Sequence, residues 1–127
     1  MEDSRTVYLT DGHTKKVPFL EFMREPEMAH WTTLSYPFLL LADAVLSSNL
    51  IIIESEPGTM LDALETCRYL RSNIKIIILF VSSDDNEESA LEAFEAGADD
   101  YIVTPISSAL FNAKLQAWQR WIVSQRD

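Results

Sequence analysis

Short apolar runs rich in β-branched residues recur along the chain and predict buried β-strands. Apolar runs without alternation are typical of strands covered on both faces, as in a parallel sheet between two layers of helices. Four such runs are TVYL (6–9), LIII (50–53), IKIIILFV (74–81) and the shorter YIV (101–103). A fifth candidate, MAHWTTL (28–34), alternates more. We therefore expect strands near residues 6–10, 28–34, 50–54, 74–81 and 100–103.

Segments with apolar residues at helical spacing lie between these runs. They predict helices over residues 17–25, 35–46, 59–71, 85–97 and 107–123. Ser35 is a candidate cap for the second helix, and Asp85 and Glu88 have capping-box spacing at the fourth. Gly97 stands where a helix end favours left-handed backbone. The stripes expected to face the core are Ala63, Leu64, Cys67 and Leu70 in the third helix, and Phe111, Leu115, Trp118 and Ile122 in the fifth.

The alternation of strands and helices defines the fold class. It predicts an α/β fold with a doubly wound, five-stranded parallel sheet in the order 2-1-3-4-5, flanked by helices. Functional sites in such sheets lie beyond the carboxyl ends of the strands. The residues expected there are Thr10, Asp11, Glu54 to Glu56, Ser82, Ser83 and Thr104.

Composition narrows the class of protein. The length of 127 residues fits one domain, residues 1–127. A net charge of −10, with ten basic residues in no dense cluster, argues against binding to nucleic acid or to an anionic membrane. No run is long enough to span a membrane, and the single cysteine, Cys67, excludes an internal disulfide. We expect a cytoplasmic protein in which Cys67 belongs to the core.

The segment SSDDNEESALEAFEAGADDYIVTP (82–105) resembles the second half of a bacterial response-regulator receiver domain. Such domains have a hydroxyl residue, an acid-rich helix start, and then G-A-D-D-Y and K-P. TVYLTDG (6–12) resembles their first strand with its acidic pair, and LIIIESEPG (50–58) resembles their third strand with its phosphoacceptor. The resemblance spans nearly the whole chain and is strongest over residues 50–105. It implies a flavodoxin-like, CheY-like fold.

The resemblance also implies a site that this chain keeps only in part. A working receiver has a phosphoacceptor aspartate, two further acids that hold Mg²⁺, a hydroxyl residue, a lysine and a switch aromatic. Ser82 matches the hydroxyl, Tyr101 the aromatic and Asp11 the second acid. Thr10 replaces the first acid and Thr104 replaces the lysine.

The acceptor position departs from the family as well. It falls on Glu54 or, by strict offset from Pro57, on Ile53. A glutamate places its carboxylate one methylene further out, and misplacement by about 1 Å can cost on the order of 100-fold in rate. At most, Asp11 and Glu54 would hold Mg²⁺ weakly, and otherwise they are two solvated acids. We therefore expect a pseudo-receiver, not an enzyme, that needs no cofactor.

Two functions from different classes follow from the resemblance. The first is phosphorylation-independent binding to a protein partner or an output domain, as a free-standing adaptor or as the N-terminal domain of a longer regulator. The second is a receiver that a histidine kinase still phosphorylates at an unusual acceptor. A flavodoxin-like cofactor binder is disfavoured because the chain has three glycines and no phosphate-binding loop.

The face made by the fourth helix, fifth strand and fifth helix is the expected interaction surface. In many relatives this face forms homodimers or docks a partner. Its candidate contact residues here are Lys114, Trp118 and Trp121. Trp121 lies off the main apolar stripe, so it is either a partly exposed binding anchor or packing against the fourth helix.

Overall fold

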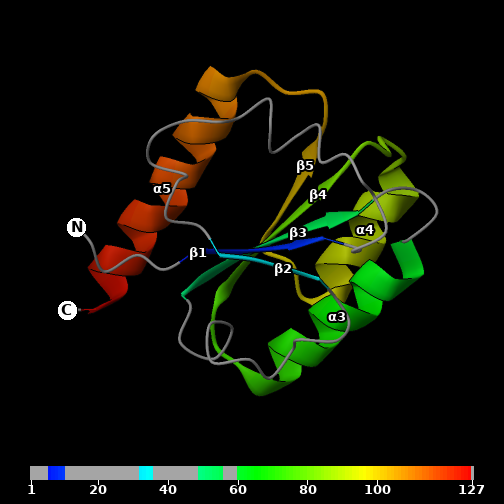
Figure 1. Cartoon of the computed structure of the whole chain (residues 1–127), viewed down its shortest axis with the longest axis horizontal. Coiled ribbons are helices and arrows are strands. Elements are labelled where there is room, and N and C mark those ends of the chain that lie inside the picture. The colour runs from blue at the N-terminus through cyan, green and yellow to red at the C-terminus, as the bar shows by residue number, and fades with distance from the viewer. Residues whose placement is uncertain (1–5, 11–31, 36–48, 56–59, 127) are drawn as a thin grey trace.

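Five parallel strands form one sheet in the order β2-β1-β3-β4-β5 (Figure 1). The computed structural model describes residues 6–10, 32–35, 49–55 and 60–126. The strands are β1 (Thr6–Thr10), β2 (Thr32–Ser35), β3 (Leu50–Ser55), β4 (Ile77–Ser82) and β5 (Asp100–Val103). All four strand pairs are parallel. The predicted sheet order and strand direction are therefore confirmed.

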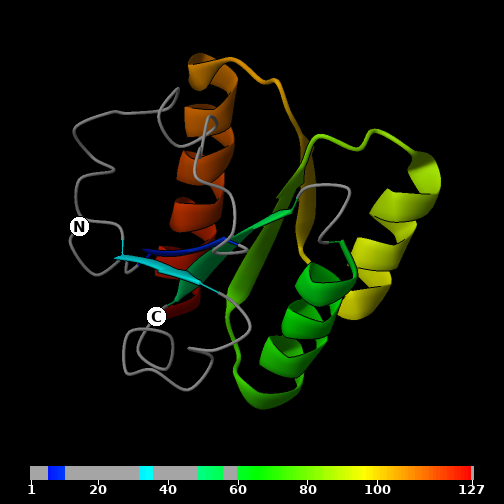
Figure 2. The same ribbon diagram turned by 45° about the vertical axis from the view of Figure 1, so that its right-hand side comes forward.

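The helices of the described residues cover both faces of the sheet. They are α3 (Met60–Asn73), α4 (Glu87–Ala96) and α5 (Ser108–Arg126). In Figures 1 and 2, α3 and α4 lie side by side on one face, and α5 crosses the other. This arrangement is the two-sided covering that uninterrupted apolar strands require.

The sheet separates two apolar clusters, and alternate residues of β3 enter each of them. Ile51 and Ile53 pack with α3 and α4, whereas Leu50 and Ile52 pack with α5. All four side chains are fully buried. Burying each one contributes roughly 1.5–3 kcal/mol of transfer free energy. The predicted stripes of α3 and α5 lie in these clusters, and Cys67 is a core residue.

Several predicted boundaries differ from the structure. The second strand was expected over 28–34; its described part is Thr32–Ser35, which includes Ser35, the candidate helix cap, while residues 28–31 lie outside the described residues. The fourth was expected from residue 74 but begins at Ile77, because α3 continues to Asn73 and the Ile74 amide donates to the Leu70 carbonyl. The helix predicted over 17–25, and residues 36–46 of the second, lie outside the described residues.

The start of α4 also differs from the prediction. Asn86, not Asp85, is the cap, and its side chain accepts a hydrogen bond from the Glu88 amide at 2.9 Å. The Asp84 carboxylate accepts from the Asn86 amide, also at 2.9 Å, and thereby fixes the turn that makes Asn86 the cap. The other end follows the prediction, since Gly97 has a left-handed φ of 115°.

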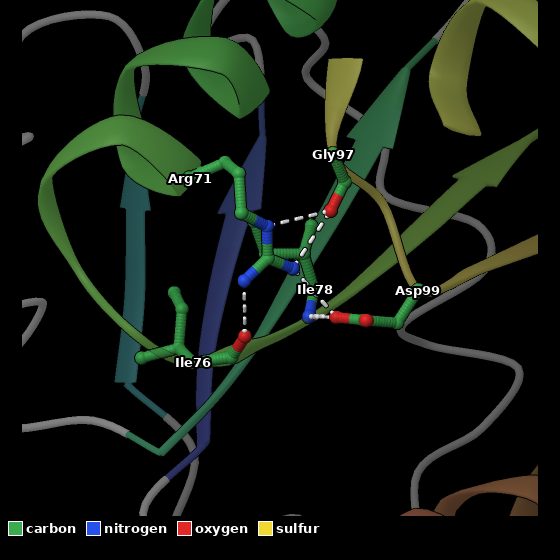
Figure 3. A network of polar contacts seen from close by, with 5 residues as sticks. All are labelled: Arg71, Ile76, Ile78, Gly97 and Asp99. Carbon is green, nitrogen blue, oxygen red and sulfur yellow. Dashed lines mark hydrogen bonds and ion pairs between the residues drawn. The ribbon is translucent and has the colours of Figure 1, made fainter. Parts of the chain in front are cut away.

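Arg71, near the end of α3, joins three segments of the chain (Figure 3). Its guanidinium donates to the carbonyl of Gly97 at 2.9 and 2.7 Å and to the carbonyl of Ile76 at 2.8 Å. It also pairs with the Asp99 carboxylate at 2.7 Å, which in turn accepts from the Ile78 amide at 2.8 Å. We refer to these five residues as the Arg71 network.

We predict that Gly97→Ala destabilises the domain by about 2 kcal/mol or more, since the left-handed backbone alone costs roughly 1–2 kcal/mol for a residue with a Cβ. A Cβ at Gly97 would also lie 2.7 Å from both Cβ and Cγ of Arg71. Urea denaturation would measure the loss. Glu95→Ala, at an exposed position of α4, is the matched control and should stay within about 0.5 kcal/mol of the parent. Equal stability of Gly97→Ala and the parent would contradict the argument.

Candidate functional site

The carboxyl ends of the strands bring the predicted site positions to one edge of the sheet. β1 ends at Thr10, β4 ends at Ser82, and Thr104 follows β5 directly. Leu9 pairs with Ile53, so Thr10 and Glu54 follow paired residues on adjacent strands. The side chain of Thr10 and the whole of Asp11 lie outside the described residues, so the expected contribution of Asp11 to a metal site stays a prediction.

Glu54 is the carboxylate that β3 presents at this edge. It is half-buried and pairs in register with Val81, one residue before Ser82. The alternative acceptor position, Ile53, is fully buried in the cluster under α3 and α4. Of the two acceptor positions, Glu54 is therefore the one that presents a carboxylate here, and Glu56 lies outside the described residues. Within the described ranges, no three His, Cys, Asp or Glu side chains lie close enough together to hold a metal ion.

The loop after β4, residues 83–86, is held by hydrogen bonds that converge on Asp84. The Asp84 amide donates to the hydroxyl of Ser82 at 3.0 Å, and its carbonyl accepts from the hydroxyl of Tyr101 at 2.6 Å. Its carboxylate accepts from the Ser89 hydroxyl at 2.6 Å and from the Asn86 amide at 2.9 Å. These last two bonds hold the pKa of Asp84 below its usual value, with the Ser89 bond as the larger cause. We call this arrangement the Asp84 network.

Tyr101 links this loop to the sheet. Its ring stacks on Phe80 with centroids 5.8 Å apart, and its hydroxyl reaches the Asp84 carbonyl. Burial raises the pKa of the Tyr101 phenol, the neighbouring Ser82 hydroxyl opposes that rise, and the negative charges of Asp84 and Asp85 add to it. The neutral, hydrogen-bond-donating phenol is thus the favoured form.

The backbone of Thr104 links the end of β5 to the end of β4. Its amide donates to the Ser82 carbonyl at 2.9 Å, and the Thr104–Pro105 peptide bond is cis. Its half-buried side chain carries no charge. The residue holds the chain against β4 but offers nothing to neutralise a phosphoryl group.

The predicted interaction residues lie along α5. The Lys114 ammonium and the Trp118 indole both contact the Asp100 carboxylate, at 3.5 and 3.4 Å. Trp118 is partly buried against the core, whereas Trp121 is 49% exposed and meets Trp118 edge-on at 6.3 Å. Lys114 and Asp100 are therefore paired within the chain.

Sequence reasoning missed two apolar side chains of α4. Leu91 is 52% exposed and Phe94 is 47% exposed, because α4 buries Ala93 and Ala96 instead. The signal was present in the sequence, since residues three apart share one face of a helix. The four glutamates of α4, Glu87, Glu88, Glu92 and Glu95, are all exposed.

Comparison with known proteins identifies the family. No protein-family model matches the chain. The nisin biosynthesis regulatory protein NisR of Lactococcus lactis subsp. lactis is 30% identical over 104 residues, which are 75% of this chain and 40% of the relative. The response regulator protein GraR of Staphylococcus epidermidis is 41% identical over 59 residues, or 46% of this chain and 26% of the relative. The chain belongs to the receiver domains of response regulators.

Solved structures agree on the receiver fold. The BeF3-activated DrrB receiver domain, from Thermotoga maritima, has a TM-score of 0.68 at 19% identity and covers 92% of this chain and 98% of that one. HP1043, an orphan response regulator of H. pylori, has a TM-score of 0.63 at 21% identity, with 91% and 96% covered. The predicted CheY-like fold is thus confirmed.

The receiver spans only part of its curated relatives, between 20% and 40% of the lengths of ResD, GraR and NisR. Among the helices of the described residues, none is long and apolar enough to cross a membrane. The cytoplasmic location and the extent of the domain stay predictions.

We predict that Tyr101→Phe lowers stability at neutral pH by about 1 kcal/mol, since the Asp84 carbonyl loses its donor. Because folding raises the pKa of this phenol, its contribution is present below about pH 10 and is lost as pH rises above that value. The variant should therefore lose less stability than the parent between neutral pH and pH 11, as measured by urea denaturation at several pH values. Parallel losses in the two proteins would contradict the assignment.

Proposed function

We propose that this receiver acts as a phosphorylation-independent protein–protein interaction domain of a bacterial signalling regulator. The observation that carries the proposal is the Asp84 network. Ser82 and Tyr101, the two side chains that respond to phosphorylation in ordinary receivers, are both already engaged with Asp84. The loop after β4 is thus held in place by groups of the chain itself.

This matters because a ligand shifts a conformational equilibrium only by its differential interaction with the two states. A phosphoryl group switches a receiver by drawing in the loop and the aromatic. In this chain the loop after β4 is already hydrogen-bonded to Tyr101, so a phosphoryl group would add little to the stability of that arrangement. The domain would then present one surface at all times.

The charges at the carboxyl edge support the same conclusion. Phosphoryl transfer requires metal and lysine to meet the charge on the transferred group. Thr10 and Thr104 stand at two of those charged positions, and both are neutral. Mg²⁺ prefers carboxylate oxygens in near-octahedral geometry, which a threonine supplies poorly. The residues present therefore do not fit the magnesium site of a working receiver.

The interaction surface we propose lies on α4 and continues onto β5 and α5. Leu91 and Phe94 supply exposed apolar area, and Val103 and Leu110 add to it at 37% and 52% exposure. The exposed glutamates of α4 surround the apolar pair with negative charge. Because Lys114 is already paired with Asp100, it is a weak source of the positive charge that a second copy would need. A partner or output domain with apolar and basic side chains suits this face better than a second copy does.

One observation favours the alternative, in which a histidine kinase phosphorylates the domain. Glu54 keeps a carboxylate at the end of β3, in the strand next to that of Ser82. The response of the domain to beryllofluoride or acetyl phosphate with Mg²⁺ separates the two functions.

We expect beryllofluoride with Mg²⁺, or acetyl phosphate with Mg²⁺, to leave the domain unchanged. Amide chemical shifts of Ser82, Asp84 and Tyr101 would report any response, with an ordinary receiver treated identically as the positive control. Saturable shifts at these three residues would support the phosphorylated alternative. Loss of those shifts in Glu54→Gln would then assign the acceptor.

We expect Phe94→Glu to abolish capture of the physiological partner, because a charge on the apolar surface must be desolvated on binding. Pull-down with the domain from the source cell, quantified by mass spectrometry with and without acetyl phosphate, is the measurement. Leu61→Glu is the matched control, since Leu61 is 68% exposed but belongs to α3 and not to the proposed surface. Equal capture by both variants would exclude the α4 surface.

A further inference from the structure

A pocket lies at the amino ends of the strands, at the opposite end of the sheet from the candidate site. It is partly open to solvent and has a volume of about 470 Å³, which is within the usual range for small-molecule sites. Its lining includes Asn49 before β3, Ile76 before β4 and Asp99 before β5. Arg71 and Lys75, at and after the end of α3, and Trp121 of α5 complete its polar and aromatic walls.

The pocket carries a positive charge in a chain whose net charge is −10. The Arg71 guanidinium is balanced by Asp99 at 2.7 Å. Lys75 is exposed and makes no ion pair within the part of the chain that the structure describes. Among the described residues, the pocket therefore holds one ammonium group without an ion-pair partner, which favours an anionic ligand.

An aromatic surface borders the same pocket. Trp121 is 49% exposed and touches Trp118 edge-on, with 67° between the ring planes. Ile76 and Ile122 add an apolar wall and are themselves almost fully buried. An exposed indole beside an apolar wall is suited to stacking with a planar ring.

We propose that this pocket binds a small planar ring compound that carries an anionic group, with the ring against Trp121 and the anion against Lys75. The Arg71 network gives the site a rigid base, since it fixes the end of α3 against the starts of β4 and β5. The proposal is independent of the function proposed above, because the pocket and the Asp84 network lie at opposite ends of the strands. A competing explanation is that Lys75 only complements the negative end of α3.

The test is a titration of the ¹⁵N-labelled chain with two probes, adenosine 5′-monophosphate and 1-naphthyl phosphate. Adenosine and inorganic phosphate serve as the ring-only and anion-only controls. We expect saturable shifts of the Lys75, Ile76 and Ile77 amides and of the Trp121 indole N–H with at least one probe. Affinity for adenosine or phosphate alone should be weaker, and salt should weaken binding of the probes but not of adenosine.

Substitutions at exposed positions assign the two contacts without risk to the core. Trp121→Ala should weaken binding at least about fivefold, as loss of a stacking platform does. Lys75→Gln should weaken it about two- to fivefold and remove the preference for the nucleotide over adenosine. Arg120→Gln changes an exposed neighbour that does not line the pocket and should bind like the parent. The proposal is overturned if neither probe shifts these signals, or if the shifts persist unchanged in Trp121→Ala and Lys75→Gln.

Discussion

The contacts of the Arg71 guanidinium hold together the part of the domain where α3 ends and β4 and β5 begin. Two segments direct oxygens at Arg71 where α3 ends: the one before β4 through the Ile76 carbonyl, and the one before β5 through the Gly97 carbonyl and the Asp99 carboxylate. Leaving such groups without a donor costs about 1–3 kcal/mol apiece. One planar, permanently charged group with several donors satisfies them together, and a lysine in its place would satisfy fewer. The left-handed glycine, the start of β5 and one wall of the pocket all take their positions from this group.

The apolar pattern predicted the sheet because it follows directly from burial. The runs at β3 and β4 are apolar without interruption, since both faces are covered, and the stripe of α3 lies in the core as predicted. The choice between neighbouring candidate helix caps was harder to predict. Asp85 and Asn86 are both good caps, and the hydrogen bond from the Asn86 amide to the Asp84 carboxylate favours Asn86. The second strand has a weaker pattern, and it reaches Ser35, one residue beyond its predicted end.

Contacts between distant residues could not be predicted from one sequence. Arg71 and Asp99 stand 28 positions apart, and neither has a neighbour that marks it as half of a pair. The resemblance to receivers identified Ser82 and Tyr101 but was silent on Asp84, which joins them. That residue reads as one more acid in an acid-rich helix start. Its importance comes from geometry. Its backbone contacts Ser82 and Tyr101, and its side chain contacts Asn86 and Ser89.

The buried thiol of Cys67 has a consequence for the chemistry available to the domain. Burial raises its pKa to about 11, against a smaller opposing effect of the Arg71 charge. Thiolate is the form that oxidants and electrophiles attack, and almost none exists at neutral pH. Oxidative modification would first require α3 to leave the sheet. As long as that helix stays packed, the Cys67 thiol is protected from oxidants and electrophiles.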